Sequence, residues 1–97
     1  MRYSLTEKLQ EDAPQEIDVK GTILTVNTDA KTVLKLMDIV NTKGEVEGAL
    51  EAIDLLFSKE DRKKIDELKL SMANYTTLLS TAMQLAVGAD PDEESGE

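Results

Sequence analysis

The side chains of this sequence that could do chemistry are nearly all carboxylates. Aspartate and glutamate number 20 in 97 residues. They form four close pairs along the chain: Glu45/Glu47, Glu51/Asp54, Glu60/Asp61 and Asp66/Glu67. Paired carboxylates perform general acid–base catalysis when the environment of one partner raises its pKa. Each of these pairs falls on the polar side of an amphipathic pattern, which predicts solvated acids that pair with lysines and not a catalytic centre.

The residue types on which most enzymes and metal sites depend are missing. The sequence contains no Cys, no His and no Trp. Without Cys there are no disulfides, thiolate zinc sites or cysteine nucleophiles. Without His the usual general base and every Ser-His-Asp triad are lost. We therefore expect no catalytic residues, no metal, no cofactor and no enzymatic activity.

The charge of the chain is unevenly distributed. The formal net charge is −9, and the eight residues from Asp90 to Glu97 carry five acids and no base. This run lacks the spacing of a twelve-residue calcium loop, and it holds too few apolar side chains to offset the entropy of ordering. We expect residues 89–97 to form a disordered acidic tail that aids solubility. The net charge also argues against nucleic acid and anionic membranes as partners.

One basic cluster interrupts this pattern. Arg62, Lys63 and Lys64 are consecutive, but acids bracket them on both sides and no glycine-rich phosphate loop is present. A solvated helix surface is the favoured interpretation. No apolar run is long enough for a membrane span, and the N-terminus lacks the apolar region of a secretory signal.

The N-terminal third predicts an arm followed by a β-hairpin. In the arm, residues 1–15, Leu5 and Leu9 lie four apart on one face of a short helical turn that Pro14 ends. Residues 16–26 alternate apolar and polar side chains around Gly21, which is typical of a hairpin. A two-stranded hairpin is marginal alone, so helices must cover its apolar face.

Two helices follow the hairpin. The first begins after Thr28 or Asp29 and runs to about Asn41. Its main apolar stripe comprises Val33, Leu34, Met37 and Val40, which Leu36 and Ile39 widen. Gly44 is expected to end it in a left-handed conformation. The second helix spans about 45–57, with apolar positions Val46, Ala49, Leu50, Ile53, Leu56 and Phe57.

The last third predicts two more helices or one long bent helix over residues 59–87. In the two-helix interpretation Ser58 caps the third helix, whose outer face carries the charged residues from Asp61 to Glu67, and Ser71 caps the fourth, which Gly88 ends. Hairpin followed by helices indicates an α+β, mainly helical fold with three to four helices. Its compact domain is expected over residues 16–88.

An apolar stripe on the last helix is the candidate partner-binding feature. It contains Met72, Tyr75, Leu78, Leu79 and Met83. Methionine adapts to irregular or changing partners. Core packing and an exposed interface both remain open for this stripe, and any part of it left exposed could join Leu5 and Leu9 in binding another chain's helix.

The order of these local patterns resembles the tail assembly chaperones of long-tailed phages and prophages of Gram-positive bacteria. The resemblance covers roughly residues 3–94 and is strongest over Leu55–Leu79. The patterns that carry it are SLTEKL, EIDVKGTILTVN, KTVLKLMDIV and LLFSKEDRKKIDELKLSMANYTTLL, followed by the acidic tail.

The resemblance implies a helical, self-associating protein that binds the tape measure protein and keeps it soluble. Tail tube subunits then polymerise around that client, and the chaperone is shed, so it acts in the host bacterial cytoplasm and is absent from the mature virion. Two other functions remain open: a small acidic phage inhibitor that mimics DNA, and a structural tail or head completion protein.

Overall fold

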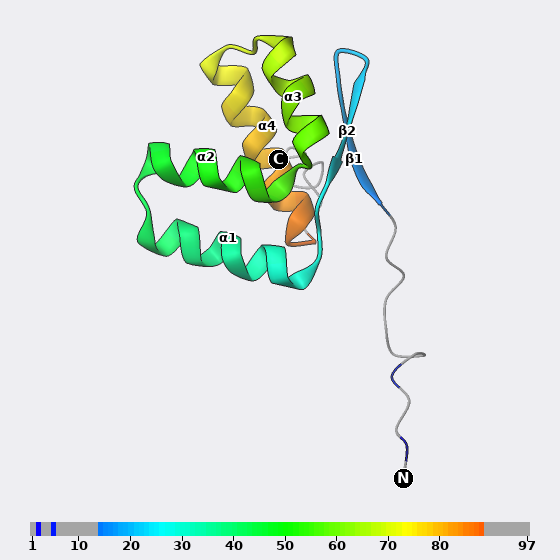
Figure 1. The fold of residues 1–97 in the computed structure, drawn as a ribbon, viewed down its shortest axis with the longest axis vertical. Coiled ribbons are helices and arrows are strands. Elements are labelled where there is room, and N and C mark those ends of the chain that lie inside the picture. Colours follow the sequence, from blue (N-terminus) through cyan, green and yellow to red (C-terminus); the bar gives the residue numbers. More distant parts are fainter. Residues whose placement is uncertain (1, 3–4, 6–13, 89–97) are drawn as a thin grey trace, which may run out of the picture.

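The fold is α+β and mainly helical, as the sequence predicts. A computed structural model describes residues 2, 5 and 14–88. Its elements are β1 (Gln15–Val19), β2 (Thr22–Val26), α1 (Ala30–Thr42), α2 (Glu45–Leu56), α3 (Lys59–Leu68) and α4 (Met72–Ala86). Helices α1 and α2 lie side by side, α2 also contacts α3 and α4, and the hairpin stands along one side of the helices, with β2 against α3 and α4 (Figure 1). The predicted acidic tail and most of the predicted arm lie outside the described residues.

The predicted hairpin is confirmed, with its first strand beginning one residue earlier, at Gln15. Its strands are antiparallel, with Ile17 opposite Leu24. The two-residue turn of Lys20 and Gly21 has positive φ angles of 54° and 88°, the pattern of a type I′ turn. That geometry requires a left-handed conformation at both positions, which glycine adopts without steric cost.

Side-chain caps begin three of the helices where the sequence predicts them. Asp29 accepts a hydrogen bond from the Thr32 amide at the start of α1. Ser58 and Ser71 do the same for the third residue of α3 and of α4. Between those two helices Lys69 takes the left-handed conformation, with φ of 52°. A single bent helix over 59–87 is therefore wrong, because the backbone leaves helical geometry at Lys69.

The expectation that Gly44 ends α1 in a left-handed conformation is also wrong. Gly44 is extended, with φ of −70° and ψ of 172°, and stands at the N-cap of α2. Lys43 is extended as well, with φ of −110°. Two consecutive extended residues reverse the chain directly from α1 into α2, so no left-handed residue is needed.

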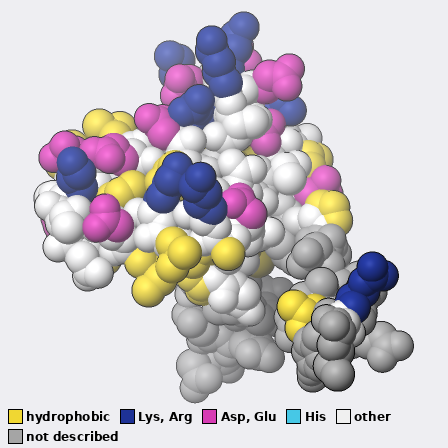
Figure 2. Space-filling view, turned by 60° about the horizontal axis from the view of Figure 1, so that its bottom comes forward, with side chains coloured by type: hydrophobic (Ala, Val, Ile, Leu, Met, Phe, Trp, Pro, Cys, Tyr) yellow, Lys and Arg dark blue, Asp and Glu magenta, His cyan; other side chains and the backbone are white. Residues whose placement is uncertain are grey.

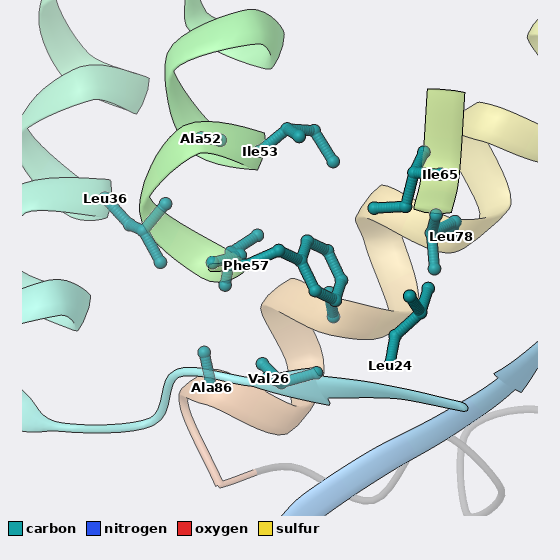
Figure 3. Close-up of a cluster of buried hydrophobic side chains, with 11 residues drawn as sticks. Leu24, Val26, Leu36, Ala52, Ile53, Phe57, Ile65, Leu78 and Ala86 are labelled. Atoms are coloured by element: carbon teal, nitrogen blue, oxygen red, sulfur yellow. The ribbon is translucent and has the colours of Figure 1, made fainter. Parts of the chain in front are cut away.

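The core lies where α2, α3, α4 and β2 converge (Figure 3). Its largest fully buried side chains are Phe57, Leu24 and Leu56. The other buried members are Val26, Leu36, Ala52, Ile53, Ile65, Leu78, Ala82 and Ala86.

Helix α1 buries a different stripe from the one that its sequence emphasises. Leu36 and Ile39 are buried, whereas Leu34, Met37 and Val40 are exposed. The main stripe expected to enter the core is thus mostly on the surface. The reason is tertiary: α1 contacts its neighbours along one side, and no described element covers the other side.

Asp61 is the one buried acid among the described residues, although the sequence placed it on the outside of its helix. Its Oδ2 accepts a hydrogen bond of 2.9 Å from the amide of Thr25 on β2. Beyond it, the Asn27 amide donates to the Leu56 carbonyl at 2.8 Å. These bonds attach the outer edge of β2 to the helices, and burial of Asp61 follows from this role.

Candidate protein-binding groove

Several carboxylates form ion pairs at the surface. Lys43 lies 3.5 Å from Glu47 and 3.7 Å from Glu51, and Arg62 lies 2.8 Å from Asp54. Within residues 14–88 and at positions 2 and 5, no group of three or more acids is arranged to hold a metal ion. The predicted carboxylate pairs therefore act as a solvated charged surface, with Asp61 as the structural exception.

Helix α4 differs from the other helices in having no charged residue. Its sequence is MANYTTLLSTAMQLA, and the uncharged stretch of the sequence extends from Leu70 to Ala89. Met72, Thr76, Leu79 and Met83 follow one another at spacings of four, three and four, so they share one face. Leu78, Ala82 and Ala86 lie on the neighbouring, buried face. The helix thus anchors itself with one face and presents a second, partly apolar face.

That second face of α4 forms one wall of a hollow of about 610 Å³. The opposite wall comes from the C-terminal part of α1, from the connection between α1 and α2, and from α2. Apolar residues on its walls are Ile39, Val40, Val46, Ala49, Leu50, Ala52, Met72, Tyr75, Leu79 and Met83. Several are far from buried: Val46 is 74% exposed, Leu50 58% and Met72 78%.

A second hollow, of about 260 Å³, continues along the C-terminal half of α4. It is lined by Val33, Leu36, Met37, Val40, Asn41, Met83 and Val87. Val40 and Met83 belong to both hollows, so the two form one continuous surface, which we call the α4 groove.

The α4 groove concentrates the exposed apolar surface of the protein. Nine large apolar side chains are exposed in the described part of the chain. Six of them line the groove: Met37, Val40, Val46, Leu50, Met72 and Val87. Figure 2 brings the α1 side of the molecule forward and shows apolar side chains gathered on the surface beside basic and acidic ones. A contiguous apolar patch bordered by polar residues marks an interaction site more often than scattered apolar residues do.

Two charged residues, Lys43 and Glu45, line the α4 groove. Helix α2 carries four acids and no base, but Glu47, Glu51 and Asp54 lie outside the lining of the groove. Lys43 partly offsets them; Glu47, and then Glu51, raise its pKa by their negative charge. On the α4 side, Tyr75 is half-buried, and its pKa is raised by burial and then by the charges of Asp66 and Asp54. The described lining of the groove thus carries one base and one acid, and its α4 wall carries no charge.

The structure brings together four of the seven predicted partner-binding residues. Met72, Tyr75, Leu79 and Met83 all line the groove. Leu78 points into the core and is 5% exposed, so it is not part of this surface. Leu5 is exposed but does not line the groove, and Leu9 lies outside the described residues.

Sequence reasoning missed the opposite wall. The apolar stripes of α1 and α2 include Met37, Val40, Val46 and Leu50, and an apolar stripe by itself predicts a buried helix face. The available signal was an excess of apolar positions: α1 has six large apolar residues, more than one buried face of a thirteen-residue helix needs.

Comparison with known proteins gives no relative: no family model matches the sequence, and no curated protein or solved structure matches it. Among the described residues no helix has the length and apolar character required to cross a membrane. The groove itself is therefore the basis for any functional conclusion.

Proposed function

We propose that this chain is a tail assembly chaperone of a long-tailed phage or prophage. In this role it binds the tape measure protein and keeps it soluble until tail tube subunits assemble around it. The role is non-enzymatic, belongs to the host cytoplasm, and ends before the virion is mature. The proposal combines the family resemblance of the sequence patterns with the properties of the α4 groove.

The observation that carries the proposal is the groove's exposed apolar lining along an uncharged helix. A chaperone for an aggregation-prone helical client needs apolar surface to cover the client's apolar stripe. Three of the four methionines in the sequence, Met37, Met72 and Met83, line this surface. Their flexible side chains can repack against different sequences. The net charge of −9 favours solubility of the resulting complex, because added acids are effective solubilisers.

Co-expression tests the proposal. The protein is produced together with a long α-helical tail protein encoded beside it, and the soluble fraction is examined by gel filtration. We expect a soluble complex and an insoluble client when the client is expressed alone. If the two proteins are recovered separately, and the client is equally soluble alone, the proposal fails.

Two further measurements separate this function from the other two. Mass spectrometry of mature particles should not detect the chain, whereas a completion protein would be present in them. Deletion of residues 90–97 should leave client binding intact, whereas a DNA mimic would lose most of its acidic surface and its inhibition with it.

A further inference from the structure

We propose that the outer edge of β1 binds an extended segment of a partner protein that carries Lys or Arg at alternate positions. The segment adds a third strand to the hairpin, with its bases opposite Glu16 and Asp18 and the residue between them directed toward α4. This surface shares no lining residue with the α4 groove, and it goes beyond the proposed function. Three features support it: the register of the hairpin, a hollow beside β1, and the charges of the strand.

The register of the hairpin decides which backbone groups of β1 face outward. In an antiparallel pair, residues that exchange backbone hydrogen bonds alternate with residues whose amide and carbonyl groups point away from the partner strand. The pair that flanks the two-residue turn is hydrogen-bonded, and so is the second pair after it, Ile17 with Leu24. The amides and carbonyls of Glu16 and Asp18 therefore point away from β2, along the outer edge of β1.

The hairpin stands at one side of the helices (Figure 1), and its two edges differ. On β2 the outward amides of Thr25 and Asn27 are already bonded, the first to the Asp61 carboxylate and the second to a carbonyl of α2. On β1 no strand pairs with the outward groups of Glu16 and Asp18 in the part of the chain that the structure describes. Unpaired backbone groups on a sheet edge are the groups to which an extended peptide adds as a further strand.

A hollow of about 330 Å³ lies between β1 and α4. Ile17 and Val19 line it from the hairpin, and Leu70, Thr77 and Thr81 line it from the opposite side. In an added strand, the residue opposite Ile17 projects to the same face of the sheet as Ile17 does. Its side chain therefore enters this hollow, which suits a β-branched residue such as Val or Thr because the lining is apolar on one side and hydroxyl-bearing on the other.

The other face of β1 presents two acids. Glu16 and Asp18 are exposed, and neither is in an ion pair within the described residues. The turn uses only Oδ1 of Asp18, which accepts a hydrogen bond from the Gly21 amide. Lys20 lies in that turn, beyond the last outward residue of β1. Since opposite charges on neighbouring strands attract and like charges repel, a partner strand gains by placing a base opposite each acid.

The same acids disfavour a second copy of this chain as the occupant. In a two-fold symmetric pairing of two β1 edges, every register that pairs Glu16 or Asp18 with its counterparts places an acid opposite an acid. No extended segment of the chain itself supplies the basic pattern either. The only two bases in the sequence that are two positions apart are Arg62 and Lys64, and both lie in α3. The occupant that fits is a segment of another protein.

The test uses the isotope-labelled full chain and synthetic peptides of about nine residues, enough to cover the five residues of β1. One peptide alternates Lys with Val or Thr, the second has Glu in place of each Lys, and the third has the composition of the first with its lysines consecutive. Nuclear magnetic resonance gives the affinity from amide shifts. We expect the alternating Lys peptide to bind at least about fivefold more tightly than either of the others, because two cross-strand charge pairs depend on its pattern.

Hydrogen exchange shows whether the peptide joins the sheet. Saturation with the alternating Lys peptide should slow exchange of the Glu16 and Asp18 amides by at least about fivefold, because both become hydrogen-bonded. The amide of Thr25, which already has a partner, should change by less than about twofold. Binding by side-chain charge alone would leave all three amides unaffected.

Two substitutions at one position separate the backbone from the charge. Glu16→Gln removes the charge and keeps the outward amide, whereas Glu16→Pro removes both. Proline is tolerated on edge strands where the lost N–H faces outward, so the hairpin should persist, which circular dichroism checks. We expect Glu16→Gln to weaken binding of the alternating Lys peptide by about two- to fivefold. Glu16→Pro should weaken it by about a further threefold or more, because one backbone hydrogen bond is lost.

A pair of double variants tests the position of the charge. Glu16→Gln with Asp18→Asn removes both acids of the edge and keeps an acceptor for the Gly21 amide. Asp38→Asn with Glu45→Gln removes two exposed acids from α1 and α2 and gives the same net charge. Only the first should weaken binding of the alternating Lys peptide, by about five- to tenfold. Raised salt should reduce the difference between the two, as for exposed charges.

Each other outcome overturns the proposal. Equal binding of the Lys and Glu peptides, or unchanged exchange at Glu16 and Asp18, excludes an added basic strand. Equal weakening by the two double variants assigns binding to net charge and not to the edge. A dimer that Glu16→Pro dissociates assigns the edge to a second copy. If no peptide binds, the two acids serve only to prevent pairing between sheet edges.

Discussion

Replacement of Asp61 by alanine should destabilise the protein far more than replacement of any exposed acid. The side chain is buried, and its Oδ2 accepts a hydrogen bond of 2.9 Å from the Thr25 amide. Its Oδ1 lies 3.5 Å from the half-exposed Lys64 ammonium, an ion pair worth at most about 0.5 kcal/mol. The hydrogen bond is the larger contribution, because a bond to a charged group is worth about 1.5–3 kcal/mol and its loss leaves a part-buried amide without a partner.

The expected loss for Asp61→Ala is therefore about 2–3 kcal/mol of unfolding free energy. A domain of this size has roughly 5–10 kcal/mol in all, so the effect is large. Asp61→Asn keeps an acceptor of the same length and loses only the charge, and it should cost about 1 kcal/mol. Glu67→Ala, an exposed acid on the same helix, is the control and should stay within about 0.5 kcal/mol of the wild type.

Urea denaturation followed by far-ultraviolet circular dichroism measures these differences, with the slope of the unfolding free energy expected to stay constant. Amide hydrogen exchange at Thr25 should accelerate in Asp61→Ala, because its acceptor is gone. If Asp61→Ala loses less than about 0.5 kcal/mol, or if Asp61→Asn and Asp61→Ala are equally unstable, the hydrogen bond does not hold β2 to α3.

Two further predictions concern α2 and α4. Gly48→Ala should stabilise the protein by about 0.5–1 kcal/mol, because alanine favours the helix more than glycine does. The added Cβ would lie 3.5 Å from Cγ2 of Ile39, an ordinary van der Waals contact. A thermal melt measures the effect, and a lowered melting temperature would show that α1 and α2 pack too closely for a methyl group. In a Tyr3→Phe background, ultraviolet titration should place the pKa of Tyr75 above 10, because burial and then the Asp66 charge disfavour the phenolate. As pH rises, Tyr75 then ionises in the unfolded state before it does in the native state, so its contribution to stability is full below about pH 10 and is lost as pH rises through the native pKa. A titration midpoint of Tyr75 at or below pH 10 would contradict the raised pKa.

Most of the secondary structure could be predicted because its signals are local. Asp29, Ser58 and Ser71 each cap a helix through a hydrogen bond to a residue three positions later, so the sequence contains both partners. Gly21 at the hairpin turn is equally local. Gly44 was the exception, because a glycine between two helices suits either the end of the first or the start of the second. Only the path of the chain into α2 decides between them.

One of the two walls of the α4 groove could be predicted from the sequence. The α4 wall could be found from Met72, Leu79 and Met83, which fit a helical stripe in an uncharged segment. The α2 wall could not, because Val46 and Leu50 fit an amphipathic pattern that normally indicates burial. Leu78 shows the converse. Its position in the sequence fits the α4 stripe, but its side chain lies on the neighbouring face of α4, in the core.

The sequence by itself determined the element types, most of their limits, the absence of the residues that most catalytic and metal sites require, and the confinement of charge to particular segments. Those properties depend on residue identity and on spacings of two to four positions. The tertiary structure alone decided which apolar stripes are covered, because burial depends on how many neighbours a helix has in space. It left Val40, Val46, Leu50 and Met72 uncovered along α4, and it buried Asp61 against the edge of β2.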